Sequence, residues 1–417
     1  MSIDRLPSPI ATGPTPDAPR LDASGLDASG PARPGTPPSA TVDLVRRSWA
    51  LVEPQTEELT RLFYGLLFGR MPETRSLFPV NMQVQRGRLL RALVHVVQLV
   101  DRPDELEPFL DQLGRDHRKF DVADAHYDVL GGALVDAVAR FSGAAWTPQI
   151  EGAWRHAYRI AADRMRTAAA AERGPASWTG VVLEHRRIGW DLAIVRVQTD
   201  TPIPYRAGQY LSVETPHRPR LWRYLSPAGP PRPDGVLEFH VRAVEGGWVS
   251  RAVVAHTTPG ETWRIGPPMG RLSIESASGD GLLLIAGGTG VAPVRAIVER
   301  LVEQGATRPT TLFTGGRTTA DLYDLPHLRT LGRRNAWLDV VPVIEKIDEH
   351  GILDDHRTLE TGAEIGTLAD VVSRYGAWRD HDVIVCGSPA MVRATVGRLL
   401  VAGTPLDRIR YDPFTLD

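Results

Sequence analysis

The feature that most constrains this chain is an apolar run that ends directly in a glycine-rich turn. Residues 283–286 read Leu-Leu-Ile-Ala, as in a buried strand, and Pro293 falls in the first turn of an expected helix. The turn between them consists of Gly287, Gly288, Thr289 and Gly290. Without Cβ atoms such a turn lets the backbone approach a pyrophosphate, and the next helix offers free N–H groups. A tight turn without a ligand is the alternative for these glycines alone.

A second glycine turn follows the apolar run 383–386, which ends in Cys386, and it begins with Gly387. Buried strands alternate with helical segments throughout this part of the chain. The strands are expected at 282–286, 310–313, 338–344 and 383–386, and two of the helices at 293–302 and 389–400. This alternation predicts a parallel sheet in an α/β domain over 278–417, with ligands at the carboxyl ends of its strands.

The preceding part of the chain divides by composition and periodicity. Residues 1–40 hold nine prolines and four glycines, which predicts a disordered tail. From 41 to 167 the apolar residues recur at helical spacing, which predicts an all-α domain. A linker over 168–177 follows, and the period then changes to two over 178–277, which predicts an antiparallel β-barrel. There Leu237, Phe239 and Val241 alternate with Glu238, His240 and Arg242.

Composition excludes several classes of protein. The 417 residues carry 48 basic and 50 acidic side chains, so the net charge of −2 gives no reason to expect a nucleic-acid partner. The single cysteine, Cys386, excludes an internal disulfide and a zinc site of several cysteines. No apolar run reaches ~18 residues, and the N-terminus lacks the order of a signal peptide. We therefore expect a cytoplasmic protein without membrane insertion that requires no protein partner. The only two lysines, Lys119 and Lys346, are interpreted as a mark of genome composition.

Two stretches in the expected barrel complete a known pattern with the glycine turns. The first contains Tyr210 and then Arg223, Tyr224, Leu225 and Ser226; the second contains Gly246, Gly247 and Ser250. Taken in order, the four motifs resemble the ferredoxin–NADP reductase superfamily over 178–417. The resemblance implies a barrel that binds FAD and an α/β domain that binds nicotinamide. It also implies that Arg223 neutralises the FAD pyrophosphate, Ser226 bonds near the reactive flavin nitrogen, and Tyr210 packs on the flavin. The turn at 246–250 would add pyrophosphate contacts.

The pattern departs from the superfamily before the serine. An aromatic residue is usual there, but this chain has Leu225, and Tyr224 stands one place earlier, on the opposite face of a strand. The stacking partner on that side of the flavin is therefore open. Near the carboxyl end, Phe414 stands where a terminal aromatic of this superfamily covers the flavin, with simple packing of an apolar tail as the alternative.

In the helical region one histidine has the spacing of a haem ligand. His117 precedes a short break and a new helix, Gln85 stands 32 residues before it, and Tyr64 stands 14 residues before Phe78. These residues, fused ahead of a reductase, resemble flavohaemoglobin over 42–417. The other histidines of the region, His95, His126 and His156, are expected to be structural.

The resemblance implies a haem b site and assigns its parts. His117 would ligate the iron, Tyr64 and Gln85 would hold bound O₂, Phe78 would wedge the haem, and Tyr127 would work behind His117. In this family a glutamate of the last globin helix assists that tyrosine, but 168–171 are all alanine here, and the residue before His117 is Asp116 instead of the usual lysine. Whether Asp116 or a backbone carbonyl replaces the missing acid is open.

The function implied is transfer of electrons from NADH through FAD to haem, where O₂ and nitric oxide give nitrate. This is nitric oxide dioxygenase activity. The segment 316–324 looks like the NADH-using branch, although Arg317 could meet the 2′-phosphate of NADPH. Two alternatives are an oxygen- or redox-sensing globin with its own reductase, and an NADH reductase that serves another acceptor.

Overall fold

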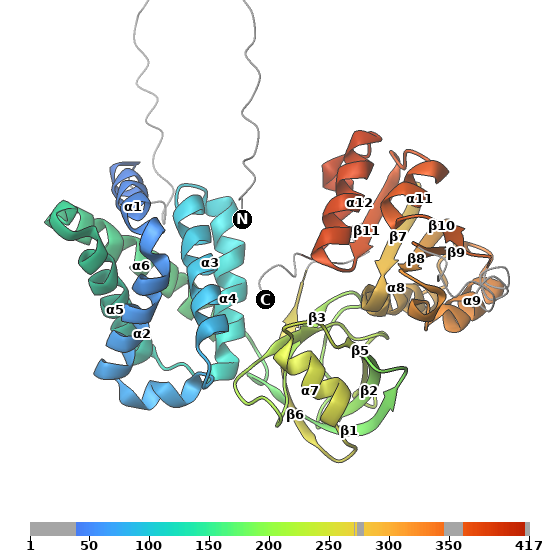
Figure 1. Ribbon diagram of the computed structural model, residues 1–417, viewed down its shortest axis with the longest axis horizontal. Coiled ribbons are helices and arrows are strands. Elements are labelled where there is room, and N and C mark those ends of the chain that lie inside the picture. The colour runs from blue at the N-terminus through green and yellow to red at the C-terminus, as the bar shows by residue number, and fades with distance from the viewer. Residues whose placement is uncertain (1–38, 271, 273–278, 346–361, 413–417) are drawn as a thin grey trace, which may run out of the picture.

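The computed structural model describes residues 39–270, 272, 279–345 and 362–412. Figure 1 shows three parts in chain order: a helical domain, a β-barrel and an α/β domain. In the described residues no helix is long and apolar enough to cross a bilayer. The α, β and α/β order agrees with the fold class expected from the sequence.

Six α-helices build the first domain, with short 3₁₀ turns between them. They are α1 (Ser39–Val52), α2 (Thr56–Arg70), α3 (Gln83–Leu99), α4 (Pro103–His117), α5 (Asp124–Ser142) and α6 (Pro148–Ala171). Prolines stand at the first helical position of α4 and α6, where a missing N–H costs no hydrogen bond. The apolar faces of α1, α2, α3, α5 and α6 meet in one core, in which the Trp154 indole donates to the Ser48 hydroxyl at 2.9 Å. Helix α4 packs in a second, smaller cluster with residues of α3 and α6.

Two predicted boundaries differ from the structure. Most of the predicted tail lies outside the described residues, but its last two residues, Ser39 and Ala40, are helical and begin α1. The four alanines predicted as linker, 168–171, form the last turn of α6. Alanine has the highest helix propensity, so the helix continues through this run instead of ending before it.

The second domain is a six-stranded antiparallel sheet in the order β4-β3-β6-β1-β2-β5. Its strands are β1 (Trp178–Arg187), β2 (Leu192–Thr199), β3 (Tyr210–Glu214), β4 (Arg223–Leu225), β5 (Val236–Arg242) and β6 (Thr262–Met269). A bridge between Pro227, just after β4, and Phe239 of β5 joins the two edges. Helix α7 (Trp248–His256) follows β5.

The outward face of β5 is more buried than its alternating pattern predicts. His240 is only 5% exposed, although its neighbours in sequence point into the barrel core. The reason is tertiary, because the α/β domain covers that face through a polar network described below. A period of two shows which face a side chain occupies, but not what covers that face.

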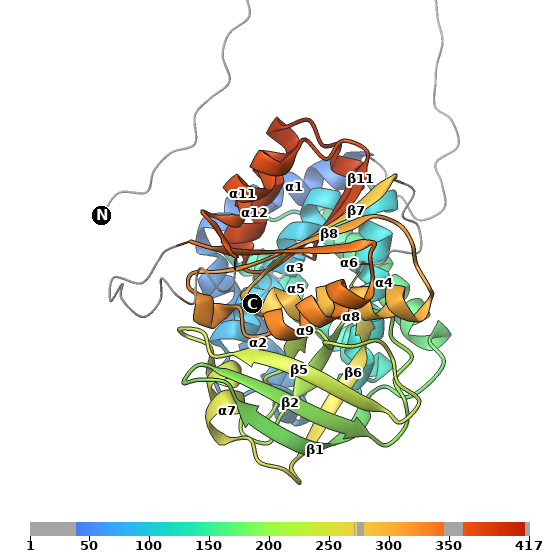
Figure 2. The same cartoon turned by 90° about the vertical axis from the view of Figure 1, so that its right-hand side faces the viewer.

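The third domain is a parallel sheet in the order β10-β9-β8-β7-β11-β12 with helices on both faces (Figure 2). Its strands are β7 (Gly281–Gly287), β8 (Thr310–Gly316), β9 (Leu338–Ile344), β10 (Glu364–Ile365), β11 (His381–Cys386) and β12 (Ile409–Arg410). Its helices are α8 (Val291–Glu303), α9 (Leu325–Arg334), α11 (Leu368–Tyr375) and α12 (Pro389–Val401). The strand order reverses between β7 and β11, which is where ligands bind in open parallel sheets.

Candidate functional site

The two glycine turns predicted from the sequence lie side by side at the carboxyl ends of β7 and β11. A Cβ atom on Gly290 would lie 2.3 Å from the Cys386 carbonyl oxygen, so only glycine allows the two turns to approach this closely. Gly288 has a φ of +55°, which favours glycine, and no atom of the described residues lies within 4 Å of the place its Cβ would occupy. At Gly288 the turn therefore exposes backbone without a side chain, which fits the close approach of a dinucleotide pyrophosphate.

Two residues that were predicted to line the nicotinamide site beside these turns are buried. Pro293 lies in the first turn of α8, and Cys386 ends β11 with 3% of its surface exposed. Burial raises the pKa of the Cys386 thiol, so the residue is a protonated thiol, not a nucleophile. Cys386 therefore shapes the turn by its size and backbone. Phe414 lies outside the described residues.

The predicted flavin motif forms a short hairpin. Strands β3 and β4 pair with Ser212 opposite Tyr224 and Leu211 opposite Leu225. Leu225 packs against the apolar core of the barrel, whereas the Tyr224 ring points the other way and lies 5.0 Å from the Tyr210 ring. The structure thus brings the Tyr210 and Tyr224 rings together on one face of the hairpin. Leu225, where the superfamily usually has an aromatic residue, lies on the other face. Ser226 follows directly after β4.

The turn that contains Gly246 and Gly247 leads into the N-terminus of α7. Gly246 has a φ of +72°, and within the described part of the chain no atom lies within 4 Å of the place its Cβ would occupy. Ser250 fixes the turn from inside the helix, because its hydroxyl donates to the Gly247 carbonyl and accepts from the Val244 N–H, both at 3.4 Å. Open backbone N–H groups at a helix start suit a phosphate, so this turn fits the flavin pyrophosphate.

The residues expected on the oxygen-binding side of the haem meet in the structure. Tyr64 of α2 is 5% exposed and shares a side-chain hydrogen bond with Gln85 of α3. Its ring packs edge-on against Phe78 with centroids 5.4 Å apart. Burial raises the pKa of Tyr64, so its hydroxyl keeps its proton and remains a hydrogen-bond donor.

His117 is the last residue of α4, and the backbone sets its orientation. Its Nδ1–H donates to the Leu113 carbonyl at 2.7 Å, which leaves Nε2 as the nitrogen with a free lone pair. Burial lowers the pKa of His117, so the neutral imidazole, the form that ligates metals, is favoured. The described hydrogen-bond partner of the His117 ring is thus a backbone carbonyl, whereas Asp116 pairs with Lys119.

The other residues expected behind His117 are engaged elsewhere. The Tyr127 carbonyl accepts from the Tyr158 hydroxyl at 2.5 Å, and the Arg166 guanidinium lies 4.9 Å from the Tyr127 ring. These contacts tie Tyr127 to α6. Asp116 pairs with Lys119. The described contacts of Tyr127 and Asp116 thus give neither residue a bond to His117.

Helix α3 has the character of a haem-pocket wall. Its apolar face carries Leu89, Leu90, Leu93 and Val94, yet all four side chains remain partly exposed. The helix contacts both α2, which carries Tyr64, and α4, which ends at His117. An incompletely covered apolar wall between a histidine and a hydrogen-bond donor fits a haem plane.

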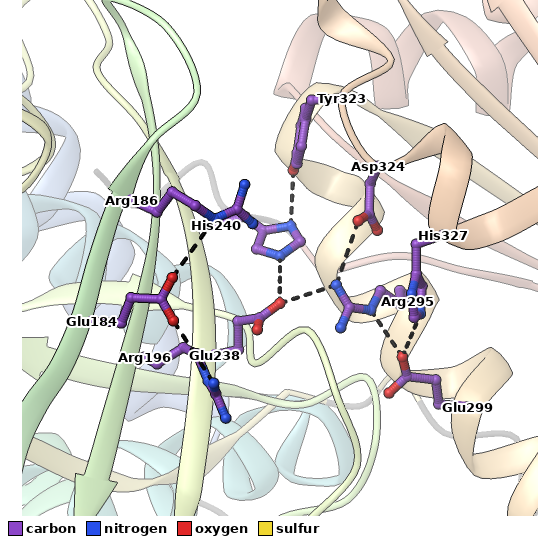
Figure 3. Close-up of polar contacts among 10 residues, drawn as sticks. All are labelled: Glu184, Arg186, Arg196, Glu238, His240, Arg295, Glu299, Tyr323, Asp324 and His327. Carbon is purple, nitrogen blue, oxygen red and sulfur yellow. Dashed lines mark hydrogen bonds and ion pairs between the residues drawn. The ribbon is translucent and has the colours of Figure 1, made fainter. Parts of the chain in front are cut away.

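A polar network joins the barrel to the α/β domain (Figure 3). Glu238 of β5 accepts from His240 at 3.1 Å and from Arg295 of α8 at 3.0 Å. The Tyr323 hydroxyl contacts the other ring nitrogen of His240 at 2.9 Å, and Arg295 also reaches Glu299 and Asp324. The hydrogen bond from His240, helped by Arg295, lowers the pKa of Glu238 to about 2. These contacts hold the two cofactor-binding domains together.

Replacing Glu238 by glutamine is expected to destabilise this junction in a pH-dependent way. Because the folded-state pKa is depressed, the carboxylate stabilises the fold above its ordinary pKa of 4.5, and that stabilisation is lost as pH falls towards about 2. Thermal unfolding of Glu238→Gln should therefore show a deficit of ~1–3 kcal/mol at pH 7 that shrinks below pH 4.5. Glu184→Gln, an exposed carboxylate of the same barrel, serves as the control. A deficit independent of pH would contradict the assignment.

Sequence reasoning missed the residues that join the domains. Lys119, just past α4, is buried against the barrel, where burial lowers its pKa and Asp116 opposes that shift. Trp222, next to Arg223, is 3% exposed and its backbone carbonyl accepts from Arg88 of α3 at 3.1 Å. The one sequence feature that could have drawn attention to Lys119 is that lysine is rare in this chain, with two lysines among 48 basic residues.

The comparisons with known proteins match this order of domains. The models that match are a globin at 61–165, an oxidoreductase FAD-binding domain at 179–274 and an oxidoreductase NAD-binding domain at 284–397. The flavohemoprotein of Bacillus subtilis is 22% identical over 389 residues, which are 90% of this chain and 96% of that protein. The solved flavohemoglobin from Malassezia yamatoensis, with bound FAD and heme, has a TM-score of 0.74 at 19% identity and covers 90% of this chain and 98% of that one.

Other relatives match only the last two domains. The ferredoxin–NAD(P)(+) reductase component of the naphthalene 1,2-dioxygenase system of Pseudomonas putida is 32% identical over 228 residues, or 54% of this chain. The chain spans 65% of the length of that component and 66% of the xylene/toluene monooxygenase electron transfer component, just under two thirds of each. The barrel and α/β domain therefore form a unit that also occurs in proteins named as reductases.

Proposed function

The chain belongs to the flavohaemoglobins, a globin joined to FAD- and NAD-binding domains of ferredoxin-reductase type, and we propose that it oxidises nitric oxide to nitrate. It is an NAD(P)H-dependent oxidoreductase with haem, FAD and nicotinamide as cofactors. When bound, FAD accepts hydride and passes electrons on singly, and the haem supplies the oxygen chemistry. The protein's own task is to bind, orient and separate these groups.

In this proposal, three regions bind the cofactors. The glycine-rich 287–290 turn beside Gly387 holds the nicotinamide dinucleotide. Arg223 and the 246–250 turn hold the FAD pyrophosphate. His117 would hold the haem through Nε2, and Phe78, which packs on Tyr64, would help to hold it. We propose NADH as the donor, with NADPH as the alternative through Arg317.

The observation that carries the nitric oxide proposal is the buried pair of Tyr64 and Gln85. A phenol that keeps its proton at neutral pH, fixed by an amide, donates to an oxygen that gains negative charge during the reaction. The Leu113 carbonyl gives His117 a neutral partner, so we also propose slower turnover than in relatives with a carboxylate there.

The test is nitric oxide consumption in the presence of O₂ and NADH, with nitrate measured against NADH oxidised. We expect Tyr64→Phe, which removes one hydroxyl, to slow consumption at least ~10-fold through loss of one donor. Flavin reduction by NADH should not change, since Tyr64 lies in the globin domain. The control is Tyr158→Phe, which removes another buried hydroxyl of the same domain.

The alternatives give different results in the same assay. A sensor would bind O₂ but form no nitrate in proportion to NADH. A reductase for another acceptor would oxidise NADH at a rate indifferent to nitric oxide. Either result, or equal rates for wild type and Tyr64→Phe, would refute nitric oxide dioxygenase activity through Tyr64.

A further inference from the structure

Lys119 is a buried cation between the globin domain and the barrel. Its side chain is 1% exposed, and its Nζ donates to Asp116 at 2.5 Å and to the Ser212 hydroxyl of β3 at 2.9 Å. The barrel leaves room for it, because a Cβ on Gly266 of β6 would lie 3.1 Å from the lysine Cδ. Burying a lysine is costly unless it is paired and hydrogen-bonded, and here both conditions are met.

Aromatic rings surround this ammonium group. Its Nζ lies 4.8 Å from the Trp222 ring, 5.1 Å from the Phe120 ring and 5.8 Å from the Tyr224 ring. Two of these rings come from the flavin hairpin or its flank, and one comes from the turn after His117. Cation–π attraction in a desolvated place therefore adds to the two hydrogen bonds of Lys119 in holding the domains together.

Two of these rings, Phe120 and Trp222, connect the barrel to His117. The Phe120 ring lies 5.7 Å from the His117 ring, and the Trp222 ring lies 6.1 Å from the Phe120 ring, both edge-on. Trp222 is covalently joined to Arg223, the residue expected at the FAD pyrophosphate. The Arg264 guanidinium lies 5.2 Å from the Trp222 ring and donates to the Lys119 carbonyl at 3.0 Å, so it also contacts both residues.

We propose that Phe120 and Trp222 are the contact through which electrons pass from the flavin domain to His117, and that Lys119 positions this contact. The proposal rests on the electron-transfer part of the proposed function and not on nitric oxide as substrate. Each passage moves one electron from the reduced flavin to the ferric iron, and no bond forms or breaks at these side chains. Lys119 is a positioning residue, since its pairing with Asp116 and Ser212 sets the distance between the two domains.

The experiment measures haem reduction after anaerobic mixing of the full-length holoprotein with NADH, without nitric oxide. Flavin bleaching and the haem Soret shift are followed separately by stopped flow. Trp222→Leu is expected to slow haem reduction at least tenfold and to leave flavin reduction within twofold of wild type. Trp222→Phe, which keeps a ring, should restore most of the rate. Trp190→Leu, at an indole 82% exposed, is the control.

A second pair of variants tests Lys119 with a readout that does not depend on turnover. The double variant Asp116→Asn/Lys119→Met removes both charges, so neither is left buried without its partner. We expect it to slow haem reduction about as much as Trp222→Leu. It should also raise amide hydrogen exchange at 118–120 and 210–225, in the loaded and the cofactor-free protein. The control is Arg102→Met/Glu105→Gln, an exposed ion pair of the same i,i+3 spacing near the start of α4.

The outcomes separate this inference from the proposed function. Equal haem reduction by Trp222→Leu and Trp222→Phe, or unchanged reduction in both, would overturn the ring contact. Unchanged exchange and unchanged haem reduction in the double variant would overturn the positioning role of Lys119. A protein that consumes no nitric oxide but loses haem reduction in Trp222→Leu would refute the dioxygenase proposal and leave this inference standing.

Discussion

His117→Ala is expected to lower haem occupancy below about a tenth of wild type while FAD content stays the same. Nε2 of His117 is the nitrogen left free by the Leu113 bond, and the pocket wall beside it is apolar. A porphyrin held without an iron–imidazole bond keeps only its apolar contacts, and those do not fix it in one place. The FAD site belongs to the barrel, a domain with its own core, so loss of haem from the globin domain should not change FAD retention.

The other histidines of the globin domain make contacts of their own, away from His117. His95 packs edge-on against Phe109 at 4.5 Å, His126 accepts from the Ala123 N–H, and His156 contacts Arg159. The measurement is the Soret absorbance per protein together with flavin released on denaturation. His126→Ala, a histidine of α5, is the matched control and should keep its haem. Normal haem in His117→Ala would remove this residue from the site.

Arg223→Ala should weaken FAD binding by ~1.5–3 kcal/mol, which is about 10- to 150-fold in affinity. The expected cause is loss of a charge-assisted, two-pronged contact to the pyrophosphate at the start of β4. Arg223→Lys keeps the charge without the planar fork and should fall between wild type and alanine. Haem content should not change in either variant.

Fluorescence titration of the FAD-free protein measures this affinity. Arg196→Ala is the control, because Arg196 lies on β2 of the same barrel, 3.7 Å from an exposed glutamate (Figure 3). If Arg223→Ala binds FAD as tightly as wild type, the pyrophosphate is held elsewhere, and the 246–250 turn becomes the first place to look.

The sequence predicted those parts of the molecule that depend on local chemistry. The glycine turns after β7 and β11 were predictable because a backbone that must come within van der Waals contact of its neighbour excludes a Cβ. The resemblance implied that Tyr64 and Gln85 belong to one site, but their hydrogen bond to each other became visible only in the fold. The order of α, β and α/β parts followed from a change of period along the chain.

What the sequence did not predict depends on contacts between domains. The pattern of β5 shows that His240 faces away from the barrel core, but not that Tyr323 covers it. From the sequence Asp116 is a candidate partner for His117, but in the structure it pairs with Lys119. The Lys119 ammonium also donates to Ser212, 93 residues later in the chain and in another domain, and the sequence does not show this contact. The contact of Lys119 with the barrel could not be predicted, because the periodicity of a helix carries no information about a partner domain.

The two sides of the barrel would expose different kinds of side chain to water if the domain packed against each side were removed. Towards the α/β domain the barrel presents Glu238, His240 and Arg242, side chains that hydrate readily. Towards the globin domain it presents Trp222, whose indole is almost wholly covered in the full chain. A fragment cut between α6 and β1 would thus expose a large aromatic surface and tend to self-associate, whereas one ending after β6 would stay dispersed at that face.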